Sequence, residues 1–209
     1  MVFSSDLSFG NVSLNESITG SAGNDTLDGG AGTDIALYSG NRASYTTAKT
    51  AAGWAVSSAT DGLDTLANIE RLKFADTAIA LDTSGVGGQA YRLYQAAFNR
   101  TPDLEGLGYW VSRMDIGDSL TEVAKSFVNS AEFKSVYGAS PTNAQIVTRF
   151  YDNVLHRAAE SGGYNYWLGA LNSGQDTVAV VLASFSESAE NQAGVIGVIG
   201  NGILYTPYG

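Results

Sequence analysis

The chain has 209 residues, 44% of them hydrophobic and 15% charged, which is enough to bury one large core or two small ones. Eleven Lys and Arg against 21 Asp and Glu give a formal net charge of -10, which argues against nucleic-acid binding and against docking on anionic membranes, because both need a basic surface. The absence of cysteine excludes disulfides, thiolate metal sites and a cysteine nucleophile. No apolar run reaches the roughly 18 residues that span a bilayer.

A nine-residue repeat is the strongest feature of the first half. GSAGNDTLD (20–28) is followed directly by GGAGTDIAL (29–37), so Asp25 and Asp34 take equivalent places after glycine turns, and residues 11–19 keep the register loosely. This period predicts very short strands separated by Gly–Asp turns in a flattened parallel β-solenoid. Stacked turns of this kind surround a cation with oxygen atoms only, and such ligands favour Ca²⁺ over Zn²⁺ or Cu²⁺.

The pattern resembles the haemolysin-type calcium-binding repeat, the repeats-in-toxin (RTX) family, over Gly20–Leu37. The resemblance implies a short calcium-binding β-roll in which turns 18 residues apart sandwich one ion. It pairs the 20–25 turn with the region near 38–43, and the 29–34 turn with the weak copy at 11–16. One or two Ca²⁺ ions are therefore expected.

The resemblance also implies which atoms hold the ion, namely repeat carboxylates and main-chain carbonyls, with Glu16 or Asp28 as candidates to complete a shell. The implied ligands are Gly20, Ala22, Asn24, Asp25, Gly29, Ala31, Thr33 and Asp34. The sequence departs from the family pattern at Ser21, which replaces a glycine, and at Ala36, where a large apolar residue is usual. An array of Gly–Asp turns that binds no metal is the alternative interpretation.

The rest of the first half predicts further strands and then a joint. A turn is expected at 60–62, the block 64–82 resembles the segment that often closes such rolls, and the glycine-rich stretch 83–88 reads as a flexible joint. The expected domains are therefore 1–84, the roll with its β cap, and 85–209, an all-α domain. Strands are expected around 44–49, 53–58, 69–74 and 77–81.

The second half repeats at about 57 residues, since YQAAFNRTPDLEGLGYW (94–110) aligns with YDNVLHRAAESGGYNYW (151–167). Apolar residues at helical spacing predict a tandem-repeat helical domain. The apolar, glycine-rich tail at 193–205 is expected to pack back as a strand or irregular cap. Helices are expected near 89–99, 106–115, 119–137, 143–157, 163–172 and 176–190.

Residues 89–191 resemble a bacterial extracellular family catalogued as DUF 4214, through paired motifs that run from Arg100 to Trp110 and from Arg157 to Trp167. That family is often found beside calcium repeats in secreted or surface proteins, and it is distantly similar to phycobilisome linker domains. The resemblance implies a helical architecture and a location outside the cell, and it implies no reaction.

The motif residues have a plain physical interpretation. Asp103 and Glu160 precede helices and are suited to accept first-turn N–H groups, while an arginine three residues earlier is placed to pair with each. Trp110 and Trp167 are expected to fill the core between helices. The alternative for these two tryptophans is an interaction platform for a sugar ring or a partner chain.

Signals of catalysis are weak. The GDSL block resembles an esterase nucleophile motif, but Ser119 with Glu122 three residues later reads as a helix capping box. His156, the single histidine, is expected to end a helix rather than to act as a base. Asp61 and Asp64 read either as a third oxygen cluster or as turn residues. The sequence therefore predicts no enzyme.

Taken together, the residues predict an α+β secreted calcium-binding protein with a structural or adhesive role. Its roll is expected to fold on Ca²⁺ outside the cell, and its helical domain to mediate surface or matrix interactions, with a glycan or a second copy as partner. No cleavable N-terminal signal is visible and residues 158–209 hold no Lys or Arg, so export through an uncleaved C-terminal signal of a type I system is expected. The alternatives are a carbohydrate-binding module or the secretion region of an extracellular hydrolase.

Overall fold

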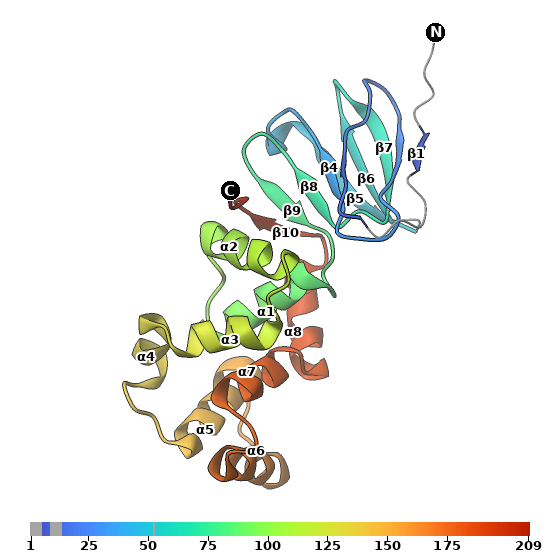
Figure 1. Ribbon diagram of the computed structural model, residues 1–209. Coiled ribbons are helices and arrows are strands. Elements are labelled where there is room, and N and C mark those ends of the chain that lie inside the picture. Colours follow the sequence, from blue (N-terminus) through green and yellow to red (C-terminus); the bar gives the residue numbers. More distant parts are fainter. Residues whose placement is uncertain (1–5, 9–13, 52) are drawn as a thin grey trace. The chain divides into compact units, whose positions relative to one another are not determined.

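The computed structural model describes residues 6–8, 14–51 and 53–209. It is α+β, as expected, and it divides into two compact units (Figure 1). The strand unit runs up to Thr83 and includes Gly200–Gly209, whereas the helical unit is Ser84–Ile199.

The strand unit contains two five-stranded mixed sheets, with the strand orders β1-β3-β7-β6-β5 and β10-β9-β8-β4-β2. A 3-10 turn at Arg42–Ser44 precedes β5. The strands are β1 (Asp6–Ser8), β2 (Ser17–Ile18), β3 (Thr26–Asp28), β4 (Ile35–Leu37), β5 (Thr46–Thr50), β6 (Gly53–Ser58), β7 (Gly62–Ala67), β8 (Arg71–Lys73), β9 (Ala78–Ala80) and β10 (Ile203–Tyr205).

Successive short strands alternate between the two sheets and pair in parallel with the strand one coil later. Ser17 pairs with Ile35, 18 residues on, which is the spacing that a nine-residue repeat predicts. Thr26 pairs with Thr65, a step 21 residues longer than one such coil, because β5 and β6 leave as an antiparallel hairpin before β7 rejoins β3. The apolar residues that fill the space between the sheets are Ile18, Leu27, Ala36, Leu66 and Leu72, each 2% exposed or less.

The four strands expected after the repeat are confirmed within a residue or two, at β5, β6, β8 and β9. Strand β7 was not predicted. Its sequence, GLDTLA, alternates exposed and buried side chains, with Asp64 and Leu66 pointing inward, and a buried aspartate is not typical of a strand interior.

The helical unit consists, within the described ranges, of eight helices in two runs of four with similar lengths. Helix α3 packs against α7, and α1 against both α2 and α7. The helices are α1 (Val86–Phe98), α2 (Leu104–Asp115), α3 (Leu120–Val128), α4 (Ala131–Tyr137), α5 (Asn143–Val154), α6 (Ser161–Ser173), α7 (Val178–Ser186) and α8 (Ala189–Ile199).

Two helix predictions were wrong. The single helix expected at 119–137 is broken, because the Ser130 side chain accepts a hydrogen bond from the Phe133 N–H at 3.0 Å and starts α4. The glycine-rich tail was expected to be a strand or irregular; its last part is the strand β10, as expected, but its first part is α8, in which Val195 and Ile199 are buried. Burial of these side chains outweighs the low helix propensity of the two glycines between and before them.

The end of the chain returns to the strand unit. Strand β10 pairs antiparallel with β9, with Leu204 opposite Ile79, and buries Ile203 and Tyr205. The helical unit therefore ends at Ile199, which differs from the expected extent of 85–209.

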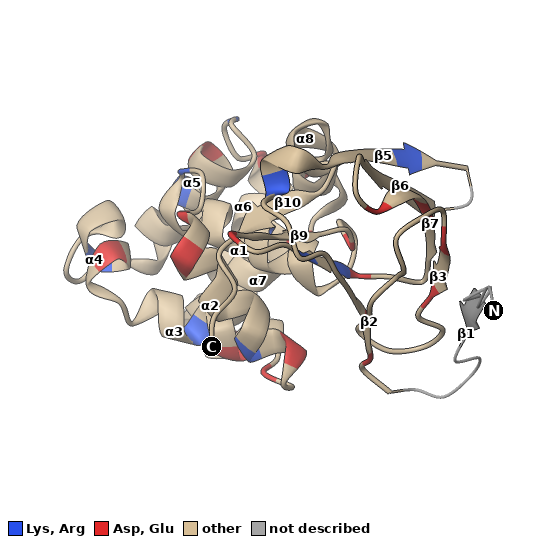
Figure 2. Cartoon of the chain, turned by 90° about the horizontal axis from the view of Figure 1, so that it is seen from above, with Lys and Arg blue, Asp and Glu red and all other residues tan. Residues whose placement is uncertain are grey.

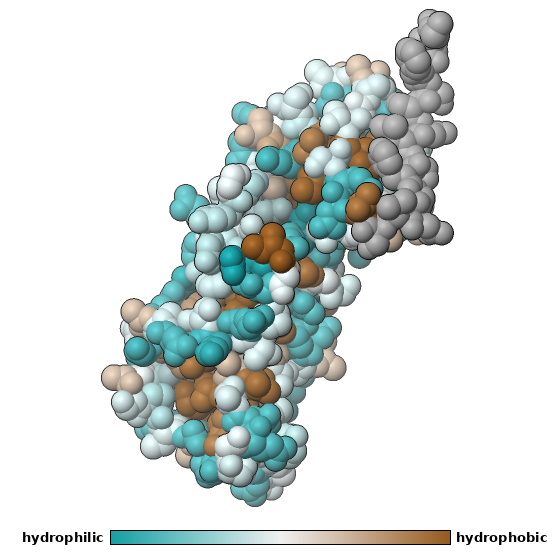
Figure 3. Space-filling view, viewed as in Figure 1, coloured by the Kyte–Doolittle hydropathy of each residue, from teal (hydrophilic) through white to brown (hydrophobic). Residues whose placement is uncertain are grey.

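On the face in Figure 3, brown residues form several small groups that are separated by hydrophilic ones. In the part of the chain that the structure describes, no helix has both the length and the apolar character needed to span a membrane.

Candidate calcium site

The turn at 29–34 stacks directly on residues 14–16. The main-chain N–H of Glu16 donates to Oδ1 of Asp34 at 2.8 Å, and the N–H of Ile35 donates to the Glu16 carbonyl at 2.9 Å. The Thr33 N–H donates to Oδ1 of Asn15 at 2.9 Å. This is the expected pairing of the 29–34 turn with the weak copy. Positions 11–13 of that copy lie outside the described residues.

The opposite side of the same turn stacks on residues 68–70. The N–H of Asp34 donates to Oε2 of Glu70 at 2.9 Å, and the carbonyl of Asp34 accepts from the Arg71 N–H at 3.0 Å. The Gly29 N–H donates to the Ala67 carbonyl at 3.1 Å. Asp34 therefore lies between two coils that are both hydrogen-bonded to it.

Each repeat aspartate folds back over the first glycine of its own turn. A Cβ added at Gly29 would lie 2.6 Å from Oδ2 of Asp34, and one added at Gly20 would lie 2.7 Å from Oδ2 of Asp25. Any larger residue at these two positions displaces the carboxylate. The repeat thus requires glycine at these two positions because the aspartate carboxylate lies too close to leave room for a side chain.

Asp34 and Glu16 carry buried oxygen atoms that have no hydrogen-bond partner, Oδ2 and Oε2 respectively. Asp34 is fully buried. Burial raises the pKa of Glu16, and the neighbouring Asp34 carboxylate raises it further. Unpartnered buried oxygens are rare in folded proteins, and two on adjacent acids form an environment that a cation would stabilise.

The 20–25 turn has a different neighbour from the one expected. The N–H of Asp25 donates to Oδ1 of Asp64 at 3.1 Å, and the Gly23 N–H donates to the Asp61 carbonyl at 3.3 Å. The hairpin removes residues 40–58 from the coil path, so the turn before β7 takes the stacking position that 38–43 was expected to fill.

A cavity of about 200 Å³ lies beside this turn. The Tyr38 hydroxyl donates to Oδ2 of Asp64 at 3.1 Å, and burial followed by the Asp64 charge raises the pKa of Tyr38. Burial is also the main cause that raises the pKa of Asp64. Asp25 itself accepts from the Ser21 N–H at 2.6 Å. The cavity is lined by Thr19, Gly20, Ser21, Ala22, Leu37, Tyr38, Ser39, Asp61 and Asp64.

The acidic residues form stacked columns rather than one cluster, and Figure 2 shows acidic positions beside β2, β3 and β7. Among residues 6–8, 14–51 and 53–209, no group of three or more His, Cys, Asp or Glu side chains is arranged to hold a metal ion. A cation held here would take one or two carboxylates together with main-chain oxygens. Calcium accepts such mixed oxygen sets in flexible geometry, so the residues present fit Ca²⁺.

Two family models match parts of the chain. Residues 12–37 match the RTX calcium-binding nonapeptide repeat (4 copies), and residues 124–195 match DUF4214, a domain of unknown function. A search of the curated proteins and a search of the solved structures found no match. Asp25 and Asp34 lie inside the RTX match, whereas Asp64 and Glu70 lie beyond it.

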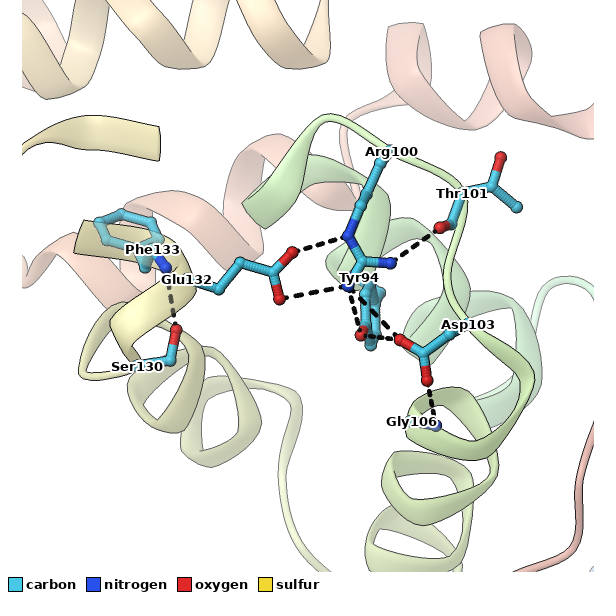
Figure 4. Close-up of polar contacts among 8 residues, drawn as sticks. All are labelled: Tyr94, Arg100, Thr101, Asp103, Gly106, Ser130, Glu132 and Phe133. Atoms are coloured by element: carbon cyan, nitrogen blue, oxygen red, sulfur yellow. Dashed lines mark hydrogen bonds and ion pairs between the residues drawn. The ribbon is translucent and has the colours of Figure 1, made fainter. Parts of the chain in front are cut away.

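The arginine motif just before the DUF4214 match forms a compact polar cluster (Figure 4). Arg100 binds both oxygens of Glu132, through Nε at 2.6 Å and Nη2 at 3.2 Å, and lies over the Tyr94 ring. The Tyr94 hydroxyl donates to Oδ2 of Asp103 at 2.5 Å, and Oδ1 of Asp103 caps α2 by accepting the Gly106 N–H at 2.7 Å. The cluster joins the ends of α1, α2 and α4.

The second arginine motif, within the residues that match DUF4214, makes some of the corresponding contacts. Arg157 binds Glu190 through Nε at 2.7 Å and Nη2 at 2.9 Å, and lies over the Tyr151 ring. The expected ion pair with Glu160 is present but longer, at 3.7 Å, and the Glu160 side chain makes no cap hydrogen bond. The sequence analysis did not assign Glu190 as the principal partner, although the same Ser-Ala-Glu triplet occurs at 130–132 and at 188–190.

Trp110, Trp167 and Ser119 contact neighbouring residues of the helical unit. Trp110 is half-buried against the Phe127 ring at 4.9 Å, and Trp167 is half-buried against the Phe185 ring at 5.6 Å. The predicted capping box is confirmed, because the Ser119 side chain accepts the Glu122 N–H and Oε2 of Glu122 accepts the Ser119 N–H.

Proposed function

We propose that this chain is a secreted calcium-binding protein whose strand unit becomes stable when Ca²⁺ binds outside the cell. The supporting observation is the unpartnered Oδ2 of Asp34, fully buried inside an RTX repeat. RTX repeats are known to bind calcium and occur in secreted proteins. A bound cation supplies the positive charge that the stacked acids lack.

The expected stabilisation is modest. A site with a dissociation constant of about 10⁻⁴ M gains about 1.4 kcal/mol per ion in 1 mM Ca²⁺, and almost nothing at cytosolic calcium levels. In this proposal the roll is loose inside the cell, where its acids repel one another. The roll folds into its stable form after export through a type I system that reads an uncleaved C-terminal signal.

The proposed role is structural or adhesive, without catalysis, and the helical unit supplies the interaction surface. Its two runs of four helices each contain an arginine that binds a glutamate and lies over a tyrosine ring, which supports a duplicated assembly module. Light scattering of the full chain tests this role. Association that rises with protein concentration in 1 mM Ca²⁺ supports self-assembly, whereas a monomer at all concentrations would contradict assembly between copies.

Thermal unfolding followed by circular dichroism tests calcium binding. The full chain is compared in a chelator, in 1 mM Ca²⁺ and in 1 mM Mg²⁺, together with Asp34→Asn. The wild-type melting temperature is expected to rise in Ca²⁺ and to change little in Mg²⁺, because Mg²⁺ demands a smaller octahedral shell. The Ca²⁺ effect is expected to be reduced in Asp34→Asn. No calcium effect on the wild type would contradict the proposal.

A further inference from the structure

Three acidic residues take the same position in three successive coils of the strand unit. Glu16, Asp34 and Glu70 each stand immediately before a strand of the second sheet. The register places them in line, since Ser17 pairs with Ile35 and Ile35 pairs with Arg71. Only the first two lie inside the matched repeat, so Glu70 extends the column from a segment that no family model covers.

The same hydrogen bond links each acid to the next. The N–H of Glu16 donates to the Asp34 carboxylate at 2.8 Å, and the N–H of Asp34 donates to the Glu70 carboxylate at 2.9 Å. The Glu70 carboxylate therefore accepts the main-chain N–H of Asp34, just as the Asp34 carboxylate accepts that of Glu16. This bond fixes the main chain of Asp34 from the side opposite to Glu16.

The buried oxygen atoms without a hydrogen-bond partner belong to Glu16 and Asp34. Oδ1 of Asp34 is used by the Glu16 N–H, which leaves Oδ2 of Asp34 and Oε2 of Glu16 buried and without a partner. The nearby cation, Arg71, is paired with Asp82. The column thus holds more negative than positive charge, and its two unsatisfied oxygens belong to adjacent acids.

We propose that Glu70, outside the matched repeat, is a positioning residue that holds Asp34 for the calcium ion that the repeat family implies between the 14–16 and 29–34 turns, where Oε2 of Glu16 and Oδ2 of Asp34 are the carboxylate ligands. This inference rests on the proposed calcium function and deepens it. The site then draws on three coils, so occupancy by the ion is coupled to docking of the 68–70 segment on the repeat. Docking of the 68–70 segment and calcium binding therefore stabilise each other.

Isothermal titration of the full chain with CaCl₂ tests the inference. Glu70→Gln keeps the size and the acceptor oxygen but removes the charge. We expect it to weaken calcium binding about 10- to 100-fold, the range seen when groups that orient metal ligands are changed. Glu16→Gln is expected to weaken binding at least as much. Glu105→Gln, an exposed acid on α2, makes the same charge change in the helical unit and is expected to leave the affinity unchanged.

A second readout separates positioning from a structural role. In chelator, Glu70→Gln is expected to melt no lower than the wild type, because it relieves repulsion among the acids, whereas in Ca²⁺ it is expected to gain less than the wild type. Wild-type affinity in Glu70→Gln, or equal destabilisation in both conditions, would overturn the inference. If Glu70→Gln does not fold, an unchanged affinity in Glu16→Gln overturns it. Absence of calcium binding by the wild type would instead defeat the proposed function.

Discussion

The main-chain N–H of Asp25 donates a hydrogen bond to Oδ1 of Asp64, 39 residues further along the chain, at 3.1 Å. The bond shows that the coil interrupted by the β5–β6 hairpin resumes at β7 in the register of the repeat. Asp64 accepts a second hydrogen bond from the Tyr38 hydroxyl. This bond connects the segment that precedes the hairpin with the strand that follows it.

Tyr38→Phe is expected to destabilise the protein by about 1.5 kcal/mol, because a buried carboxylate oxygen loses its donor while the ring remains. Tyr166→Phe removes a hydroxyl from a tyrosine that is 61% exposed and is expected to cost less than about 0.5 kcal/mol. Urea unfolding of both variants in chelator measures the difference. Equal stability of the two would show that the Tyr38–Asp64 bond does not hold the hairpin.

Gly29→Ala is expected to lower the free energy of unfolding by about 1–3 kcal/mol and to reduce the calcium response. Its Cβ would meet the Asn68 carbonyl and the Asp34 side chain, which forces the coil apart. Gly169→Ala is the matched control, since α6 leaves open space at that position and alanine favours helix by roughly 0.5–1 kcal/mol. Denaturant unfolding compares them, and a Gly29→Ala variant as stable as Gly169→Ala would contradict the close approach.

Glu187→Gln and Glu190→Gln remove the same charge from two arginine pairs of different burial. Arg92 is 3% exposed at its side chain and binds Glu187 at 2.7 Å, whereas Arg157 and Glu190 are 36% and 46% exposed. Loss of a carboxylate from a buried pair costs about 3 kcal/mol, while solvent screens an exposed pair. Calorimetric melting is expected to show a much larger fall for Glu187→Gln, and the reverse order would contradict this ranking.

The helical unit is expected to lose stability as the pH falls below about 4. The Tyr94 hydroxyl, followed by the Gly106 N–H, holds the pKa of Asp103 below its ordinary value of 3.8. A pKa that is depressed in the folded state contributes stability above the unfolded pKa, and this contribution disappears as the pH falls through the folded pKa.

Asp103→Asn tests this dependence, because it removes the titrating group and keeps the size and an acceptor oxygen. Its melting temperature is expected to fall less steeply than that of the wild type between pH 5 and about pH 2. Helical ellipticity at 222 nm follows the transition. Identical acid profiles for the two proteins would show that Asp103 is not held by its neighbours as described.

Local pattern was sufficient to predict the repeat aspartates and one of the two stacked turns. Asp25 and Asp34 recur at a visible nine-residue period, and that period correctly predicts that the 29–34 turn stacks on the weak copy, but not which segment stacks on the 20–25 turn. Asp64 and Glu70 follow the β5–β6 hairpin, which interrupts the nine-residue period, so no sequence period connects them to the repeat. Their positions are decided by strand pairing between distant segments, which a single sequence does not display.

In the helical unit, too, some features carried a signal in the sequence and others did not. The break at Ser130 carried a signal, since serine followed by an acid two residues later is typical of a helix start, yet the apolar spacing continued across it. Helix α8 carried little signal, because Gly194 and Gly197 disfavour helix when taken alone. Tertiary burial of its apolar residues overrides that preference, and burial depends on neighbours that propensity does not include.

The most direct test of calcium binding is a crystal structure of the full chain grown in millimolar CaCl₂, with anomalous scattering used to identify the ion. The account predicts an anomalous peak between the 14–16 and 29–34 turns, with Oδ2 of Asp34 as a ligand at about 2.3–2.6 Å. Oδ2 of Asp34 without an ion in saturating calcium, in an otherwise unchanged roll, would contradict it.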